Sequence, residues 1–256
     1  MIKERRMGII VSELKEKGIV TVDELAVKIN SSRSTIRRDI EELEMKQALK
    51  RIRGGAVGVA SGATAHEPPY TVRKDMFLEE KTRIAKAASG LVNSNETLLL
   101  SSGTTIHQFA KTLNEIKSPL YIATNDLMIA MDLAFYQNIE LIVLGGSLRY
   151  NHFSLNGFFA ENAIMQIHAD KAFLGVDAID FNIGMMNFSV EEIQAKKLMI
   201  QASKELIILC DHSKFEKIAF VNICAFQDVD LLITGRETPQ HIIHQVEDSG
   251  IKVLAV

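Results

Sequence analysis

Cysteine is scarce in this chain of 256 residues: there are two, Cys210 and Cys224, and no C-x-x-C pair. Without cysteines at metal-ligand spacing we expect no zinc site, and the apolar segments IILCD and NICAF predict buried free thiols. The sequence also lacks any apolar run near the roughly 18 residues that span a bilayer, and its N-terminal segment has no signal-peptide core. We therefore expect a cytoplasmic protein that holds no metal or other cofactor.

The charge is distributed unevenly along the chain. Residues 1–56 carry 13 Lys and Arg against 9 Asp and Glu, a net charge of +4, whereas the remaining 200 residues carry 16 against 23, a net charge of −7. Such asymmetry indicates a small basic module that binds a polyanion, attached to a larger acidic body. The hydrophobic content of 47% allows that body a sizeable core.

The basic part has the pattern of three short helices. Apolar spacing predicts a first helix over residues 4–17, and Gly18 ends it. Thr21 is placed to cap a second helix, with Glu24 three residues later as in a capping box. Ser32 is placed to cap a third helix over residues 33–46.

The third segment, NSSRSTIRRDIEEL, separates apolar from polar residues. At about 100° per residue, Ile36, Ile40 and Leu43 fall within one sector, so the hydroxyl groups and arginines point away from the core. Hydroxyls and arginines bind phosphates, and arginine also binds guanine with two hydrogen bonds. Taken alone, the stretch fits a solvated amphipathic helix equally well.

A basic hairpin follows, and it favours DNA. ALKRIRGGAVGV predicts two short strands around a turn at Gly54 and Gly55, with arginines on the first strand and in the turn. Three helices and a basic hairpin describe a winged helix-turn-helix. The side chains expected to contact DNA are Ser32, Ser34, Thr35, Arg37, Arg38, Arg51 and Arg53.

The rest of the chain has the pattern of an α/β domain. Residues 59–76 are small, polar and proline-bearing, which predicts a linker between residues 1–58 and residues 77–256. From residue 77 onward, apolar strands alternate with helices, as in a mostly parallel sheet covered on both faces. Ligands of such sheets bind at the carboxyl ends of the strands.

Three successive predicted strand ends carry glycines and hydroxyls, in SSGTT, ATND and LGGS. Free amides at a helix N-terminus beside such residues suit a phosphate, although each loop alone also fits simple turn geometry. An aspartate after a further strand suits sugar hydroxyls or acid–base chemistry, and a nearby helix offers a lysine that fits a phosphate contact or a solvated face equally well. The candidate effector-binding residues are Ser101, Ser102, Gly103, Thr104, Thr105, Thr124, Asn125, Gly145, Gly146, Asp177 and Lys197.

These motifs resemble those of DeoR-type bacterial transcription regulators. VTVDELAVKINSSRSTIRRDIEELEMKQALKRIRGGA is similar to their DNA-binding domain, and SSGTT, TND, LGGSLR, FLGVDAID and DHSKF are similar to their effector domain. The resemblance implies a sugar-isomerase-like α/β fold related to ribose-5-phosphate isomerase, and a phosphorylated sugar or related metabolite as effector. The chain departs from the family pattern at Ser101, where an acid is usual, and at Gly235, where aspartate is usual.

We therefore expect a regulator that binds double-stranded operator DNA and is not an enzyme. It would repress a sugar-catabolic operon, respond to a sugar phosphate, and act as a homo-oligomer, a dimer or larger. One alternative is a sugar-phosphate isomerase with an attached DNA-binding domain, but Ser101 replaces the loop acid and the TIRRD helix has no place in an isomerase. Another is a DNA-binding protein whose larger domain only oligomerises.

Overall fold

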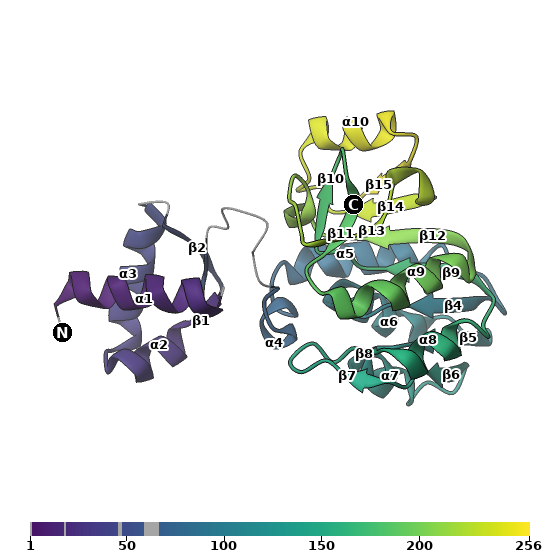
Figure 1. Cartoon of the computed structure of the whole chain (residues 1–256), viewed down its shortest axis with the longest axis horizontal. Helices are drawn as coiled ribbons and strands as arrows, with labels where there is room; N and C mark the ends of the chain where they lie inside the picture. The colour runs from purple at the N-terminus through teal and green to yellow at the C-terminus, as the bar shows by residue number, and fades with distance from the viewer. Residues whose placement is uncertain (1, 18, 46–47, 59–66) are drawn as a thin grey trace. The chain divides into compact units, whose positions relative to one another are not determined.

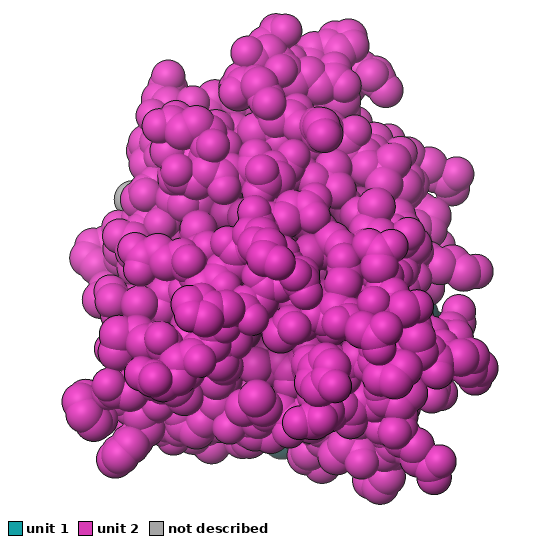
Figure 2. Space-filling view, turned by 90° about the vertical axis from the view of Figure 1, so that its right-hand side faces the viewer, with its two compact units in different colours: residues 1–68 teal, residues 69–256 magenta. Residues whose placement is uncertain are grey.

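The computed structural model describes residues 2–17, 19–45, 48–58 and 67–256. The chain divides into two compact units, Met1–Pro68 and Pro69–Val256 (Figure 1), and Figure 2 shows one face of the second unit. No helix within the described residues is long and apolar enough to cross a membrane.

The first unit contains three helices and a three-stranded antiparallel sheet. The helices are α1 (Lys3–Lys17), α2 (Val22–Ile29) and α3 (Arg33–Met45), and the strands β1 (Ile19–Thr21), β2 (Leu49–Ile52) and β3 (Gly55–Gly58) pair in the order β1-β3-β2. The expected three helices and hairpin are confirmed. Strand β1 was not predicted, because three residues are too few to display a periodic pattern.

Local sequence signals account for the helix starts and the wing. Thr21 caps α2 in a capping box with Glu24, and the Thr35 N–H donates to Ser32 Oγ at 3.2 Å, so both predicted caps are confirmed. Gly54 has φ +88°, which favours glycine, and a Cβ on Gly55 would lie 2.0 Å from the carbonyl oxygen of Val20. The two glycines therefore let the hairpin turn and let β3 pack against β1.

The second unit is built on a seven-stranded parallel sheet with strand order β15-β14-β12-β9-β4-β5-β6 (Figure 1). Its strands are β4 (Thr97–Leu100), β5 (Leu120–Thr124), β6 (Ile139–Val143), β9 (Ala169–Leu174), β12 (Ser203–Leu209), β14 (Leu231–Thr234) and β15 (Lys252–Ala255). Apolar strands alternating with helices were expected from residue 77 onward, and the α/β class is confirmed.

Helices cover both faces of this sheet. On one face, α5 (Leu78–Ser89), α6 (Thr104–Thr112) and α7 (Leu127–Leu133) pack against alternate strand residues such as Leu98 and Ile122. On the other face, α8 (Phe158–Ile164), α9 (Ile193–Gln201) and α10 (Gln240–Asp248) pack against residues such as Leu99 and Ala172. The two free cysteines, Cys210 and Cys224, are buried as predicted.

Five short strands were not predicted from the sequence. β7 (Ser147–Leu148) and β8 (Leu155–Asn156) form a hairpin, and β10 (Ala178–Asp180), β11 (Gly184–Asn187) and β13 (Val221–Cys224) form a separate antiparallel sheet. Both lie close in sequence to the carboxyl ends of main-sheet strands, so they contribute to the surroundings of any ligand bound there.

The expected linker is only partly described. Residues 59–66 lie outside the described residues, whereas residues 69–76 belong to the second unit and begin it with the short helix α4 (Tyr70–Arg73). The side chain of Tyr70 is buried. The part of the expected linker that follows Pro68 is therefore packed structure.

Candidate functional site

Helix α3 presents the expected polar face. Ile36 and Ile40 are buried in the core of the first unit, while Ser34, Arg37 and Arg38 are exposed. Within the described residues, neither Arg37 nor Arg38 has an ion-pair partner. Two unpaired guanidinium groups near the start of an exposed helix suit phosphate or guanine, and their contact with DNA stays a prediction.

All but one of the other candidate DNA contacts have partners within the protein. Ser32 Oγ caps α3 and lies 2.9 Å from Ser34 Oγ and 2.8 Å from Thr35 Oγ1. Arg51 forms ion pairs with Glu41 and Glu44, the latter at 3.5 Å. Arg53, by contrast, is exposed and has no ion pair within the described part of the chain. Of the two wing arginines, Arg53 is therefore the one without an ion pair among the described residues.

An ion pair that sequence analysis missed positions α3. Arg6 on α1 donates to both carboxylate oxygens of Asp39, at 2.7 and 3.0 Å. Asp39 is buried and lies on the core side of α3, between the exposed arginines and Ile40. An acid within an apolar stripe is the signal that could have identified it, since a buried carboxylate needs a partner.

In the second unit, the start of α6 carries a buried ammonium group. Lys81 on α5 donates to Thr104 Oγ1 at 3.0 Å, and its side chain is 3% exposed. Burial lowers the pKa of Lys81 to about 8, against the opposing effect of the Asp211 carboxylate. Sequence analysis missed Lys81, although its spacing from Ile84 and Ala85 places it on the apolar side of α5.

The loop before α6 is held in place by Asp126. Gly103 adopts φ +147°, and its N–H donates to Asp126 Oδ2 at 3.3 Å. Asp126 also caps α7 by accepting from the N–H groups of Met128 and Ile129 at 2.8 and 3.0 Å, and burial raises its pKa to about 6. The Gly103 amide therefore has a partner, while the following helix start has no side-chain cap. The amides of Thr104 and Thr105 at this helix start are therefore available to a ligand.

Several other candidate residues hold the backbone together. Thr124 Oγ1 accepts from the Asp126 N–H at 3.1 Å, and a Cβ on Gly146 would lie 2.6 Å from the carbonyl oxygen of Asn156. Gly145 is exposed and faces open space. The hydrogen bond of Thr124 and the close backbone packing at Gly146 thus account for these two residue types without a ligand.

The two positions that depart from the family pattern have structural partners. Ser101 Oγ accepts from the Gly175 N–H at 3.1 Å and donates to the carbonyl oxygen of Ser102 at 3.4 Å, which ties β4 to the end of β9. A Cβ on Gly235 would lie 2.3 Å from Glu80 Oε1. Glu80 therefore occupies the space that a side chain at position 235 would need.

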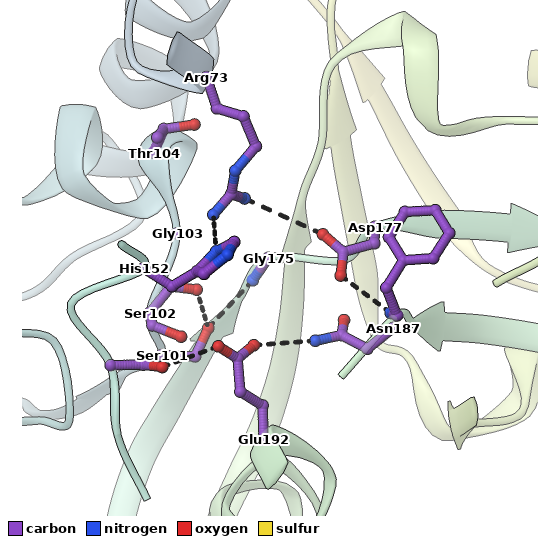
Figure 3. A network of polar contacts seen from close by, with 12 residues as sticks. Arg73, Ser101, Ser102, Gly103, Thr104, His152, Gly175, Asp177, Asn187 and Glu192 are labelled. Carbon is purple, nitrogen blue, oxygen red and sulfur yellow. Dashed lines mark hydrogen bonds and ion pairs between the residues drawn. The ribbon is translucent and has the colours of Figure 1, made fainter. Parts of the chain in front are cut away.

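Asp177 lies at the centre of a polar network beyond the end of β9 (Figure 3). Its Oδ2 accepts from the Phe188 N–H at 3.1 Å, and its Oδ1 lies 4.0 Å from Arg73 Nη1. Arg73 Nη2 is also 3.2 Å from His152 Nδ1. Sequence analysis proposed Asp177 but missed Arg73, because residue 73 fell within the expected linker.

The structure brings Lys196 to this network and leaves Lys197 exposed. Lys196 Nζ donates to the Gly175 carbonyl at 2.8 Å and to Asn187 Oδ1 at 3.0 Å, whereas Lys197 is on the solvent side of α9. Sequence analysis did not choose Lys196, which the structure places in this network, and the effector contact of Lys197 stays a prediction. The buried Glu192 completes the network through Asn187 Nδ2, at 3.0 Å.

Asn125 holds an acceptor without a partner. Its Nδ2 donates to the Leu155 carbonyl at 3.1 Å and to Asn156 Oδ1 at 3.4 Å, which fixes the orientation of the amide. Its Oδ1 is the one buried side-chain nitrogen or oxygen atom of the described residues that lacks a hydrogen bond. Such an atom is costly to bury unless a water or a ligand supplies a donor.

Comparisons with known proteins cover almost the whole chain. A family model for the DeoR C-terminal sensor domain matches residues 76–236, and one for a DeoR-like helix-turn-helix domain matches residues 6–61. The HTH-type transcriptional regulator GolR of Listeria innocua is 33% identical over 251 residues, which cover 97% of this chain and 96% of GolR. The glycerol-3-phosphate regulon repressor of Escherichia coli K12 is 31% identical over 250 residues, with 98% and 97% covered. These relatives are transcriptional regulators, not enzymes.

Solved structures resemble the chain more distantly. Ribose 5-phosphate isomerase A from Methanocaldococcus jannaschii is 20% identical, with 53% of each chain covered and a TM-score of 0.39. A similarity at this level says nothing about activity.

Proposed function

We propose a function for this chain, which belongs to the DeoR family of helix-turn-helix transcription regulators with a C-terminal sensor domain. It represses a sugar-catabolic operon and leaves its operator when a sugar phosphate binds. A regulator of this kind works in the cytoplasm, where bacterial DNA lies. The isomerase alternative is set aside, because the relatives that match over nearly the full chain are regulators.

The observation that carries the sugar-phosphate assignment is the buried ammonium group at the start of α6. Lys81 Nζ, the Thr104 hydroxyl and the uncapped amides of Thr104 and Thr105 converge where a phosphate would gain charge-assisted hydrogen bonds. The Asp211 carboxylate already favours the charged form of Lys81, and a phosphate would add a hydrogen-bonded anion at this buried cation. One relative is by its name a glycerol-3-phosphate regulon repressor, which agrees with a phosphorylated effector.

The sugar hydroxyls would bind around the neighbouring strand ends. Asn125 Oδ1 lacks a donor within the described residues, and the Asp177 carboxylate lies beyond the end of β9. A polyol phosphate supplies an anion for Lys81 and a hydroxyl donor for Asn125 Oδ1. Ser101, Gly145, Gly146, Thr124 and Lys197 are not needed for this mode of binding.

Isothermal titration with a panel of sugar phosphates tests the assignment. Replacing Thr104 and Thr105 by valine preserves volume and removes both hydroxyls, so we expect weaker binding of the sugar phosphate that the wild type binds best, with operator affinity unchanged. Equal affinity in the double variant would contradict phosphate binding at this helix start. Equal binding of the same sugar without its phosphate would show that the site does not recognise an anion.

We further propose that the protein acts as a dimer joined through the β6 edge of the sheet. Each chain has one recognition helix, and such proteins usually bind paired half-sites as two-fold dimers. Tyr121 and Ile142 lie on the same face of β5 and β6 and are 45% and 50% exposed. Phe158 and Phe159, at the start of α8 on that face, are each 73% exposed. An apolar edge of this kind is a hazard unless a second copy covers it.

Light scattering at micromolar concentration tests the dimer. We expect twice the chain mass for the wild type and a shift towards monomer for Ile142→Asp, because a carboxylate in an apolar interface must be desolvated. A monomeric wild type, with or without operator DNA, contradicts the dimer. An Ile142→Asp variant that stays dimeric places the interface elsewhere.

A further inference from the structure

Helix α4, the first element of the second unit, is anchored to the walls of the candidate effector site. The ring of Tyr70 is buried edge-on against Phe153, with centroids 5.4 Å apart, and the Tyr70 hydroxyl is hydrogen-bonded to His107 Nδ1. The Tyr70 N–H donates to the Asn151 carbonyl at 2.9 Å. One side chain thus attaches α4 both to α6 and to the loop between β7 and β8.

The other end of α4 is attached to the phosphate site itself. Lys81 Nζ donates both to the Arg73 carbonyl, at 2.6 Å, and to Thr104 Oγ1, at 3.0 Å. The ammonium group that we assign to the phosphate therefore lies directly beneath the residue that ends α4. A ligand on Lys81 and Thr104 has Arg73 as its neighbour.

The Arg73 side chain extends from α4 across this site (Figure 3). Its guanidinium group reaches His152 at 3.2 Å and comes within 4.0 Å of Asp177 Oδ1. The side chains of Arg73 and Asp177 are 13% and 7% exposed. A separation of 4.0 Å between Arg73 Nη1 and Asp177 Oδ1 is too long for a direct hydrogen bond. A hydroxyl oxygen between the two groups could lie about 2.8 Å from each of them.

We propose that Arg73 and Asp177 together bind one hydroxyl of the effector sugar, the hydroxyl donating to the carboxylate and accepting from the guanidinium. This inference rests on the proposed function and adds a residue that decides between sugar phosphates and other phosphates. It also makes α4 a wall of the effector site.

The position of α4 in the chain gives this contact a regulatory consequence. The Arg73 contact forms only while α4 is docked, so an effector that uses it stabilises the docked arrangement by the free energy of that contact. Helix α4 begins two residues after Pro68, the last residue of the first unit, so the effector stabilises the part of the second unit that directly follows the first unit in the chain.

Calorimetric titration with four probes separates the hydroxyl subsite from the phosphate subsite: inorganic phosphate, glycerol 3-phosphate, ribose 5-phosphate and fructose 6-phosphate. In the wild type, at least one sugar or polyol phosphate should bind more tightly than inorganic phosphate. We call the ratio of this affinity to the affinity for inorganic phosphate the gain. In Arg73→Gln the gain should shrink by roughly 10-fold or more, as for a lost hydrogen bond to a charged group, with the affinity for inorganic phosphate unchanged. Lys74→Gln removes an exposed charge one residue away and should retain the gain.

Hydrogen exchange of residues 69–76 provides a second measurement on the same proteins. The tightest-binding probe should slow exchange of this segment in the wild type and in Lys74→Gln, but not in Arg73→Gln. An Arg73→Gln protein that keeps both the gain and the slowed exchange overturns the inference and leaves the phosphate site intact. A wild type that binds all four probes equally also overturns it, whereas a wild type that binds none of them overturns the phosphate site as well.

Discussion

Replacing Lys81 by methionine tests the buried charge in the phosphate site. The substitution keeps an unbranched apolar stem out to Cε and removes the ammonium group that donates to Thr104 Oγ1. A hydrogen bond to a charged group contributes about 1.5 to 3 kcal/mol, so the dissociation constant of the best sugar phosphate at pH 7 should rise roughly 10- to 150-fold. Lys197→Met, on the exposed side of α9, is the matched control and should bind as the wild type does.

The pH dependence of wild-type binding tests the role of Lys81 independently. Burial lowers the pKa of Lys81 to about 8, so the free protein loses the ammonium proton as the pH rises through that value. A phosphate monoester, with a second pKa near about 6, is already a dianion at pH 7. Binding should therefore weaken by about tenfold between pH 7 and pH 9, and the Lys81→Met profile should be flat over that range.

Isothermal titration at pH 7, 8 and 9 measures both effects. Lys81→Met affinity equal to that of the wild type would refute the assignment of the ammonium group to the phosphate. A flat wild-type profile would refute the role of its ionisation. Thermal denaturation of both variants establishes that the folded state is being compared.

Two further predictions concern the first unit. Arg37→Ala combined with Arg38→Ala should weaken operator binding without unfolding the protein, by about 1 to 3 kcal/mol for each arginine that reads a base, as measured by gel shift; unchanged affinity would mean that α3 is not the reader. Gly55→Ala places a Cβ 2.0 Å from the Val20 carbonyl oxygen and should destabilise the first unit by about 1 to 3 kcal/mol in urea denaturation. The control Gly8→Ala meets open space and should stabilise α1, so equal effects of the two substitutions would contradict the packing of the wing.

Much of the fold could be predicted because its determining signals are local. The parallel strands are continuous apolar segments such as LYIAT and ELIIL, and the caps at Thr21 and Ser32 depend on residues at most three positions away. The short strands β7, β8, β10, β11 and β13 escaped prediction because each has two to four residues and includes a polar side chain, so none forms a continuous apolar segment.

The candidate site was harder to predict because its charges come from distant segments. Ser102 to Thr105 could be predicted from the strand-end motif SSGTT. Lys81, by contrast, reaches Thr104 from a position 23 residues earlier in the chain. Arg73 meets Asp177 across more than 100 positions, and only folding decides that Lys196, not Lys197, faces inward. Residue type and spacing predict a loop, whereas ion pairs between loops depend on the tertiary structure.

The most direct test of the account is release from DNA. Fluorescence anisotropy of labelled operator from the promoter upstream of its own operon should show that the wild type binds and that one sugar phosphate of the panel weakens binding roughly 5- to 150-fold, the usual range of allosteric coupling. The variant with valine at positions 104 and 105 should bind the operator equally well and resist release. Operator binding that no sugar phosphate changes, or that changes equally in the variant, would contradict a repressor controlled from this site.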